Sequence, residues 1–239
     1  MTHDLESRYY DGSYLVRNPN WDRTDAPWKA GKIAQILAEN NLEPASICEV
    51  GCGSGDVLVH LRRSLRNATM TGFDISPQVA KFWKEHQAAG ERIDFQLGDF
   101  HKINAARYDL LLMVDVLEHL RDPFTFLEKS RQCAGHFVFH IPLDLSANAI
   151  VRGDPFMDIR QKVGHLHYYT KELALATLVD TGYDIVEWRY TGASLNSPNR
   201  SLKTRLAALP RRIAYAVNKD FGVRLLGGET LLVLATSAS

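Results

Sequence analysis

The sequence has few cysteines, no net charge and no long apolar run, and each absence excludes a class of protein. Cys48, Cys52 and Cys133 are its only cysteines and include no Cys-x-x-Cys pair, which favours reduced thiols over a disulfide framework. Lys plus Arg and Asp plus Glu both number 28, so no general attraction to nucleic acid or membranes is indicated. No stretch approaches the roughly 18 apolar residues of a membrane span, and the polar start lacks a secretory-signal pattern. We expect a cytoplasmic protein with no nucleic-acid partner and no integral membrane segment; its oligomeric state is left open.

What the sequence does have is a regular alternation of strand and helix patterns. Strands are predicted at 46–50, 68–74, 92–100, 108–116, 136–142, 183–192 and 229–237. Helices are predicted at 26–42, 56–65, 77–90, 122–134 and 170–182. This order predicts an α/β fold with a doubly wound, mostly parallel sheet of seven strands and an antiparallel last strand. We expect one domain, 1–239, made of a helical cover (1–44), a core (45–190) and a connector helix with the final strand (191–239).

Three glycines, Gly51, Gly53 and Gly55, follow the first predicted strand in the stretch CEVGCGSGDV. A dinucleotide fingerprint has the spacing Gly-x-Gly-x-x-Gly and places a pyrophosphate at a helix N-terminus. Here the third glycine comes one residue early, and Asp56 fills its position with a carboxylate that opposes a pyrophosphate. Glu49 adds a second negative charge, and no Lys-Ser or Lys-Thr pair of a phosphate loop follows. The turn therefore favours a cationic ligand and disfavours an NAD-dependent reductase.

Four motifs in this order resemble the class I S-adenosylmethionine-dependent methyltransferases: EVGCGSG, GFDIS, LGDF and YDLLLMVDVLEHLRDP. The likeness covers roughly residues 45–190 and, with GHLHYYTKEL and GGETLLVLA, is greatest to the branch that includes the ubiquinone-biosynthesis O-methyltransferases. It implies S-adenosyl-L-methionine as methyl donor, S-adenosyl-L-homocysteine as product and a small-molecule acceptor, most readily a hydroxyl oxygen. The alternatives are an N- or C-methyltransferase and a non-catalytic protein that binds S-adenosylmethionine.

The resemblance also implies which residues hold the cofactor. The turn from Gly51 to Gly55 would pass under its methionine and ribose parts, with Glu49 near the ammonium group. Asp74, at the end of the second strand, would accept hydrogen bonds from both ribose hydroxyls. Asp99 would accept from the adenine amine. The full expected set is Glu49, Gly51, Cys52, Gly53, Gly55, Asp74, Ile75, Ser76, Asp99, Phe100, Val114 and Asp115.

A hydroxyl acceptor must lose its proton as it attacks, and histidine is the usual base near neutral pH. His119 follows the fourth strand at the carboxyl edge of the sheet and is the first candidate; His140, at the end of the fifth strand, is the second. An ordinary structural role remains open for both. A metal site made of His140, Asp144, His165 and His167 has suitable ligand types. No compact spacing supports it, and we expect no metal.

Four further segments have predicted roles. Residues 201–219 are basic and amphipathic and are expected to pack on the sheet or its rim; a lid, a membrane-surface element or a partner site is the alternative. They lack aromatics between the charges apart from Tyr215, so no RNA or DNA binding is expected. Acceptor specificity is expected to lie in two loops, 143–164 and 190–228. Related enzymes cover their site with an N-terminal segment, which here carries Tyr9, Tyr10, Tyr14, Trp21 and Trp28.

Overall fold

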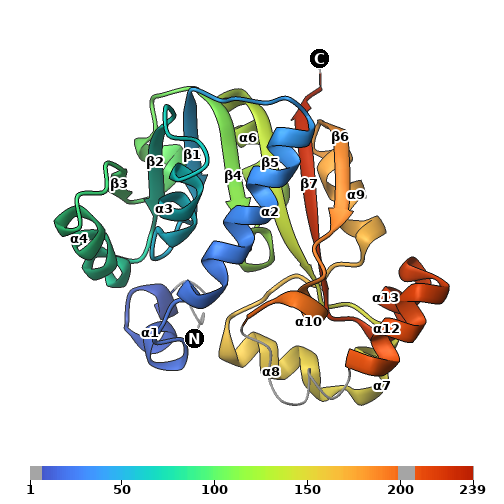
Figure 1. Cartoon of the computed structure of the whole chain (residues 1–239). Helices are drawn as coiled ribbons and strands as arrows, with labels where there is room; N and C mark the ends of the chain where they lie inside the picture. Colours follow the sequence, from blue (N-terminus) through green and yellow to red (C-terminus); the bar gives the residue numbers. More distant parts are fainter. Residues whose placement is uncertain (1–6, 199–207, 239) are drawn as a thin grey trace.

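The strands of the protein form one sheet in a computed structural model that describes residues 7–198 and 208–238 (Figure 1). Within these ranges the strands are β1 (Ser46–Val50), β2 (Thr69–Asp74), β3 (Asp94–Leu97), β4 (Tyr108–Val114), β5 (Ala134–Leu143), β6 (Tyr183–Tyr190) and β7 (Glu229–Ser237). They pair in the order β3-β2-β1-β4-β5-β7-β6. β7 is antiparallel to both β5 and β6, whereas the other pairs are parallel. The predicted mostly parallel, seven-stranded sheet with an antiparallel last strand is confirmed.

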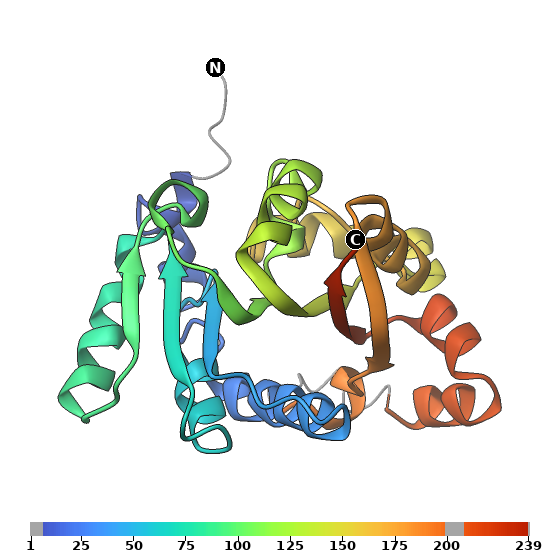
Figure 2. The ribbon, with the colours of Figure 1, turned by 90° about the horizontal axis from the view of Figure 1, so that it is seen from above.

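Helices cover both faces of the sheet, as Figure 2 shows from above. The helices of the two layers are α2 (Ala26–Glu39), α3 (Asp56–Arg62), α4 (Ala80–Ala88), α6 (Pro123–Ser130) and α9 (Lys171–Asp180). α2, α3 and α4 belong to one core cluster, and α6 and α9 to the other. Along β4, Leu110 and Leu112 face the first cluster, while Leu111 and Met113 face the second, because successive side chains of a strand point to opposite faces. Burial on both faces explains why this strand is a continuous apolar run.

Two of these helices, α6 and α9, begin where a side chain accepts from an unpaired N–H group of the first turn. Asp122 accepts from the Thr125 N–H at 3.1 Å ahead of α6, and Thr170 accepts from the Leu173 N–H at 3.2 Å ahead of α9. Such caps typically stabilise a helix by about 1 kcal/mol. They fix where each helix leaves the edge of the sheet, and hence where the loops at that edge begin.

The N-terminal segment crosses the edge at which the parallel strands end (Figure 1). It contains η1 (Ser7–Tyr9), α1 (Ser13–Arg17) and η2 (Arg23–Asp25) and leads into α2. The Ser76 hydroxyl, just after β2, donates to the Tyr9 carbonyl at 2.6 Å. This contact holds the segment against the sheet, where a cover was predicted. Among the described residues, no helix is long and apolar enough to cross a membrane.

Two segments differ from the sequence expectation. Residues 143–164, expected as a loop, contain the helices α7 (Ala147–Arg152) and α8 (Asp154–Lys162). The described part of the connector forms two helices, α12 (Ala208–Val217) and α13 (Lys219–Leu226), since Asn218 caps the second one through the Phe221 N–H at 2.9 Å; residues 201–207 lie outside the described residues. The segment 201–219 was expected to pack on the sheet or its rim, but its apolar residues Leu209 and Ile213 are 67% and 60% exposed.

Candidate active site

A cavity of about 740 Å³ lies at the carboxyl edge of the sheet, beneath the N-terminal segment. Its size is in the range of small-molecule sites, roughly 300–1,000 Å³. The predicted residues that line it are Gly51, Asp74, Ile75, Asp99, Phe100, Asp115 and His119. The aromatic residues of the cover that line it are Tyr9, Tyr10, Tyr14 and Trp21. The fold thus brings much of the predicted set to one place.

The glycine turn after β1 requires glycine for two reasons. Gly51, Gly53 and Gly55 have φ of 70°, 51° and 80°, the left-handed region that other residues rarely adopt. A Cβ on Gly53 would lie 2.5 Å from Nε1 of Trp21, and one on Gly55 would collide with a neighbouring ring. The prediction attributed the glycines to the cofactor alone. In the structure Gly51 lines the cavity, while Gly53 and Gly55 also make room for the protein's own aromatic side chains.

Asp74 ends β2 with its carboxylate buried against the glycine turn. Its Oδ2 accepts from the Gly53 N–H and its Oδ1 from the Ser76 N–H, both at 2.8 Å. Burial raises the pKa of Asp74 to about 6, although these backbone hydrogen bonds act in the opposite direction. Each carboxylate oxygen keeps a further lone pair, so Asp74 can still accept from two hydroxyl groups. Ser76 binds the Tyr9 carbonyl with its own hydroxyl, so the structure gives this predicted cofactor contact a role in holding the cover.

Glu49 is a buried carboxylate beside the same turn. It is 2% exposed, and within the described ranges its Oε2 has no hydrogen-bond partner. Burial raises the pKa of Glu49 well above its ordinary value, while the nearby Lys29 acts in the opposite direction. An unpaired buried carboxylate is costly unless a cation or a donor satisfies it. Glu49 is therefore suited to the positively charged part of a ligand.

Asp115 forms the centre of a charged network at the end of β4. Its φ is 54°, and its carboxylate binds Nζ of Lys29 and Nδ1 of His140, each at 2.6 Å. Burial would raise the pKa of Asp115, but the Lys29 ammonium and the His140 ring hold it well below its ordinary value. The second nitrogen of His140 lies 3.0 Å from the Thr230 hydroxyl. His140 is thus engaged at both nitrogens and supports Asp115.

Lys29 was not among the residues predicted from the sequence, although its position on α2 indicates that it is buried. Ala26, Ile33 and Leu37 form the buried stripe of this helix, and position 29 falls on that same stripe at helical spacing. A lysine at such a position needs a buried acid as its partner. The sequence could have identified the unusual charge, but not which acid it meets.

His119 lines the cavity from η4 (Leu117–His119), the short helix after β4. Burial and the neighbouring His165 lower the pKa of His119 to about 3, while a hydrogen bond with the Gly164 backbone acts in the opposite direction. The ring is therefore neutral near pH 7, as a proton acceptor must be. The same environment makes it a weak base. Its ring lies edge-on to that of Tyr9, with centroids 6.3 Å apart.

The remaining predicted residues are placed as follows. Asp99 accepts from the His101 N–H at 3.0 Å and caps the short helix α5 (Phe100–Ile103) at the cavity wall. The Phe100 ring packs on Phe73, with centroids 5.1 Å apart. Cys52 and Val114 are buried in the core. Asp99 and Phe100 are therefore in position to meet a ligand, whereas Cys52 and Val114 belong to the core and do not line the cavity.

The alternative metal set is not brought together. His165 Nδ1 lies 2.7 Å from Asp144, but His140 is bound to Asp115 instead. His167 uses its Nε2 to contact the Leu120 carbonyl at 2.9 Å. The four residues considered from the sequence therefore do not form one site.

Comparison with known proteins agrees with this geometry. A family described as "Methyltransferase domain" matches residues 24–188. The chain belongs to this family. It is an S-adenosylmethionine-dependent methyltransferase, and the resemblance, the fold and the cofactor predicted from the sequence are confirmed.

The methyltransferase is similar to enzymes with different acceptors. It is 26% identical over 171 residues to a ubiquinone biosynthesis O-methyltransferase of Vibrio parahaemolyticus, an alignment covering 66% of this chain and 70% of the relative. It is 24% identical over 106 residues to a norajmaline N-methyltransferase of Rauvolfia serpentina, covering 42% and 36%. Its fold matches magnesium protoporphyrin IX methyltransferase from Synechocystis, solved with bound S-adenosylhomocysteine, at a TM-score of 0.58 and 14% identity over 89% and 83% of the two chains.

The site of this methyltransferase fits its cofactor on three observations. Glu49, buried beside the glycine turn but outside the cavity lining, has one carboxylate oxygen without a partner among the described residues, which would suit an ammonium group. Asp74 supplies acceptors at the end of β2, where a ribose diol can be bound. Gly51 lines the cavity without a side chain. None of these features would favour a pyrophosphate.

Proposed function

We propose that this methyltransferase transfers the methyl group to a hydroxyl oxygen of a small molecule. S-adenosylmethionine, when bound, supplies an electrophilic methyl carbon on a sulfonium. The observation that supports the proposal is the neutral His119 imidazole on the wall of a cavity large enough for a small acceptor. Similarity to enzymes named O-methyltransferases supports it further.

The residues of the chain would perform three tasks. Glu49, Asp74 and Asp99 would hold the cofactor, as the sequence predicts. The cover would exclude water and keep acceptor and methyl group in line, which is the main contribution that positioning makes to such a displacement. His119, as the first candidate base, would take the hydroxyl proton. His140, the second, would act by holding Asp115, because both of its nitrogens are engaged.

An amine acceptor is the second candidate function. The similarity to an N-methyltransferase favours it. The ionised Asp115 at the cavity wall would also attract a cationic amine. Methylation at carbon, the third possibility kept from the sequence, has no specific contact in the structure to favour it.

Calorimetry and turnover test the proposed function. S-adenosylmethionine is expected to bind at micromolar level and NADH not to bind. With matched sets of phenols, alcohols and amines, S-adenosylhomocysteine should form fastest with a hydroxyl compound. Faster turnover of amines would contradict the oxygen assignment, and tighter binding of NADH would contradict the cofactor.

Cofactor affinity is expected to depend on the protonation of Asp74. The pKa of this carboxyl is raised to about 6 by burial, and its protonated form cannot accept from both ribose hydroxyls. The ionised fraction falls about tenfold between pH 7 and pH 5 for a group of this pKa. We therefore expect the dissociation constant of S-adenosylmethionine to rise about tenfold over that range, measured by calorimetry.

Two variants control the Asp74 prediction. Asp74→Asn should bind more weakly at pH 7 and lose the pH dependence. Asp74→Ala should weaken binding by roughly tenfold or more, since a charged hydrogen-bonding partner contributes about 1.5–3 kcal/mol. An unchanged pH profile in Asp74→Asn would show that another group titrates.

A further inference from the structure

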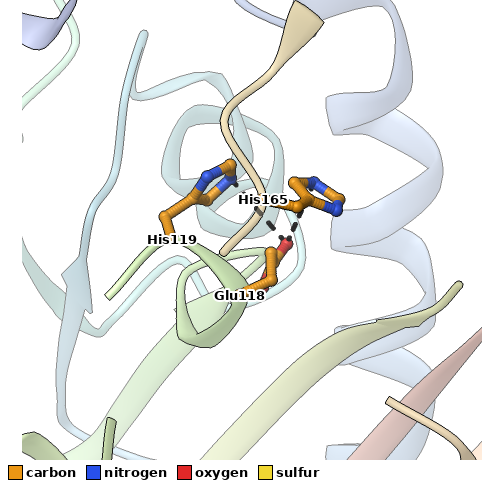
Figure 3. Close-up of side chains that lie close together, drawn as sticks. All are labelled: Glu118, His119 and His165. Carbon is orange, nitrogen blue, oxygen red and sulfur yellow. Dashed lines mark ion pairs between the residues drawn. The ribbon is translucent and has the colours of Figure 1, made fainter. Parts of the chain in front are cut away.

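Three side chains that can ligate a metal converge beside the cavity (Figure 3). Glu118 and His119 come from η4, and His165 comes from the segment after α8. Oε1 of Glu118 lies 3.9 Å from Nε2 of His119 and 3.9 Å from Nε2 of His165. One ligand atom from each residue lies within 4.8 Å of the other two. The three groups therefore face a common point.

Glu118 is the least satisfied member of this cluster. Its side chain is 1% exposed, and in the part of the chain that the structure describes neither carboxylate oxygen has a hydrogen-bond partner. Nδ1 of His119 also has none there. An ionised carboxylate in such a place is strongly unfavourable unless a cation compensates its charge. A bound cation would supply the missing partner.

His165 is already oriented as a metal ligand. Its Nδ1 lies 2.7 Å from Oδ2 of Asp144, which places the proton on Nδ1 and leaves the lone pair of Nε2 toward Glu118. A carboxylate in this position is the usual partner of a metal-bound histidine. The backbone holds the two halves together, because the Glu118 carbonyl accepts from the N–H groups of Leu166 and His167 at 2.6 and 3.1 Å. The site is therefore built before any ion binds.

We propose that Glu118, His119 and His165 bind one divalent transition-metal ion. Two imidazoles and a carboxylate are a ligand set of zinc sites that keep a position open for substrate, whereas Mg²⁺ favours oxygen ligands. With bonds of about 2.1 Å, tetrahedral ligand atoms lie about 3.4 Å apart. The observed 3.9 Å separations need to close only slightly. The absence of a metal expected from the sequence rested on a different set of four residues.

The ion would coordinate the acceptor hydroxyl. This role rests on the proposed function, methyl transfer to a hydroxyl oxygen. His119 lines the cavity, so the fourth position of the ion is within reach of an acceptor hydroxyl. Coordination lowers the pKa of a bound hydroxyl, and its proton leaves to water. The oxygen–carbon bond then forms as the carbon–sulfur bond breaks, which gives the methyl ether and S-adenosylhomocysteine. With the ion bound, His119 assists loss of the acceptor proton as a metal ligand; without the ion, its neutral ring takes that proton directly.

Cobalt binding tests the site directly. The full chain is dialysed against a chelator and titrated with Co²⁺, whose visible absorption reports ligand type and geometry, and then with Zn²⁺ as competitor. We expect one tightly bound ion per chain. Asp144→Asn should weaken binding by about 10–100-fold, and Glu118→Gln and His165→Ala by more. His60→Ala, which removes a histidine of α3 outside the cluster, should bind like the unmodified chain.

The outcomes separate this proposal from the proposed function. Absence of saturable binding, or equal affinity in Glu118→Gln and the unmodified chain, would overturn the metal site. Circular dichroism of each variant identifies loss of folding, and the isosteric Glu118→Gln keeps the test valid if His165→Ala does not fold. S-adenosylmethionine binding is measured in parallel by calorimetry. Cofactor binding without metal uptake rejects the metal site alone, and metal uptake without cofactor binding rejects the proposed function alone.

Discussion

Replacing His119 with alanine is expected to lower turnover by about 10²–10⁴-fold, the usual contribution of a general base. Affinity for S-adenosylmethionine should change little, because the predicted cofactor contacts lie on Glu49, Asp74 and Asp99. The imidazole lines the cavity and is neutral near pH 7, so it can meet an acceptor. Initial rates of S-adenosylhomocysteine formation, with the cofactor dissociation constant from calorimetry, separate the two effects.

Two results would count against this role of His119. Near-normal turnover in the variant would make His140 the next residue to test, although that ring is 2% exposed and bound at both nitrogens. A loss explained by weaker cofactor binding would instead give His119 a place in the cofactor site. His60→Ala is the matched control, since His60 lies on α3 and does not line the cavity.

Replacing Lys29 with methionine is expected to lower the free energy of unfolding by about 3 kcal/mol. Burial would lower the pKa of Lys29, but Asp115 holds it above its ordinary value, so both partners are charged in the folded protein. Breaking a buried ion pair leaves the remaining charge uncompensated, at a cost of about 3–5 kcal/mol. We expect the lower end of this range because the Asp115 side chain is 27% exposed, so water partly compensates its charge. Urea unfolding at neutral pH measures the change.

A second substitution checks the cause. Lys29→Met combined with Asp115→Asn should recover part of the lost stability, because the unpaired carboxylate is then removed. Lys32→Met, on the same helix, should stay within about 0.5 kcal/mol of the unmodified chain. A Lys29→Met protein as stable as the original would show that the pair contributes nothing measurable.

Much of the sheet could be predicted because its pattern is local. The apolar run of β4 indicates a buried strand, and the glycines after β1 indicate a tight turn. The ordered motifs place Asp74 and Asp99 at strand ends. Parallel strands bring those ends to one edge. The position of the cofactor site therefore followed from short stretches of sequence.

The rest depends on contacts between distant segments. Lys29 and Asp115 are 86 positions apart in the sequence (115 − 29). They meet only because α2 packs beside β4. His165 meets Glu118 only because the segment after α8 returns to η4. A periodicity or a motif carries no information about such a pairing. This is why the sequence led to a different set of candidate metal ligands from the one proposed above.

The position of β7 has a consequence for how the protein is made. β7 is the last of the seven described strands to be synthesised, yet it lies inside the sheet and pairs with both β5 and β6. Segments fold as they leave the ribosome, and long-range strand pairing is slow. β1 to β5 can assemble early, but β5 keeps one open edge and β6 has no neighbour until β7 emerges. During that interval the nascent chain exposes an unpaired strand edge, the kind of surface that chaperones protect from association with another chain.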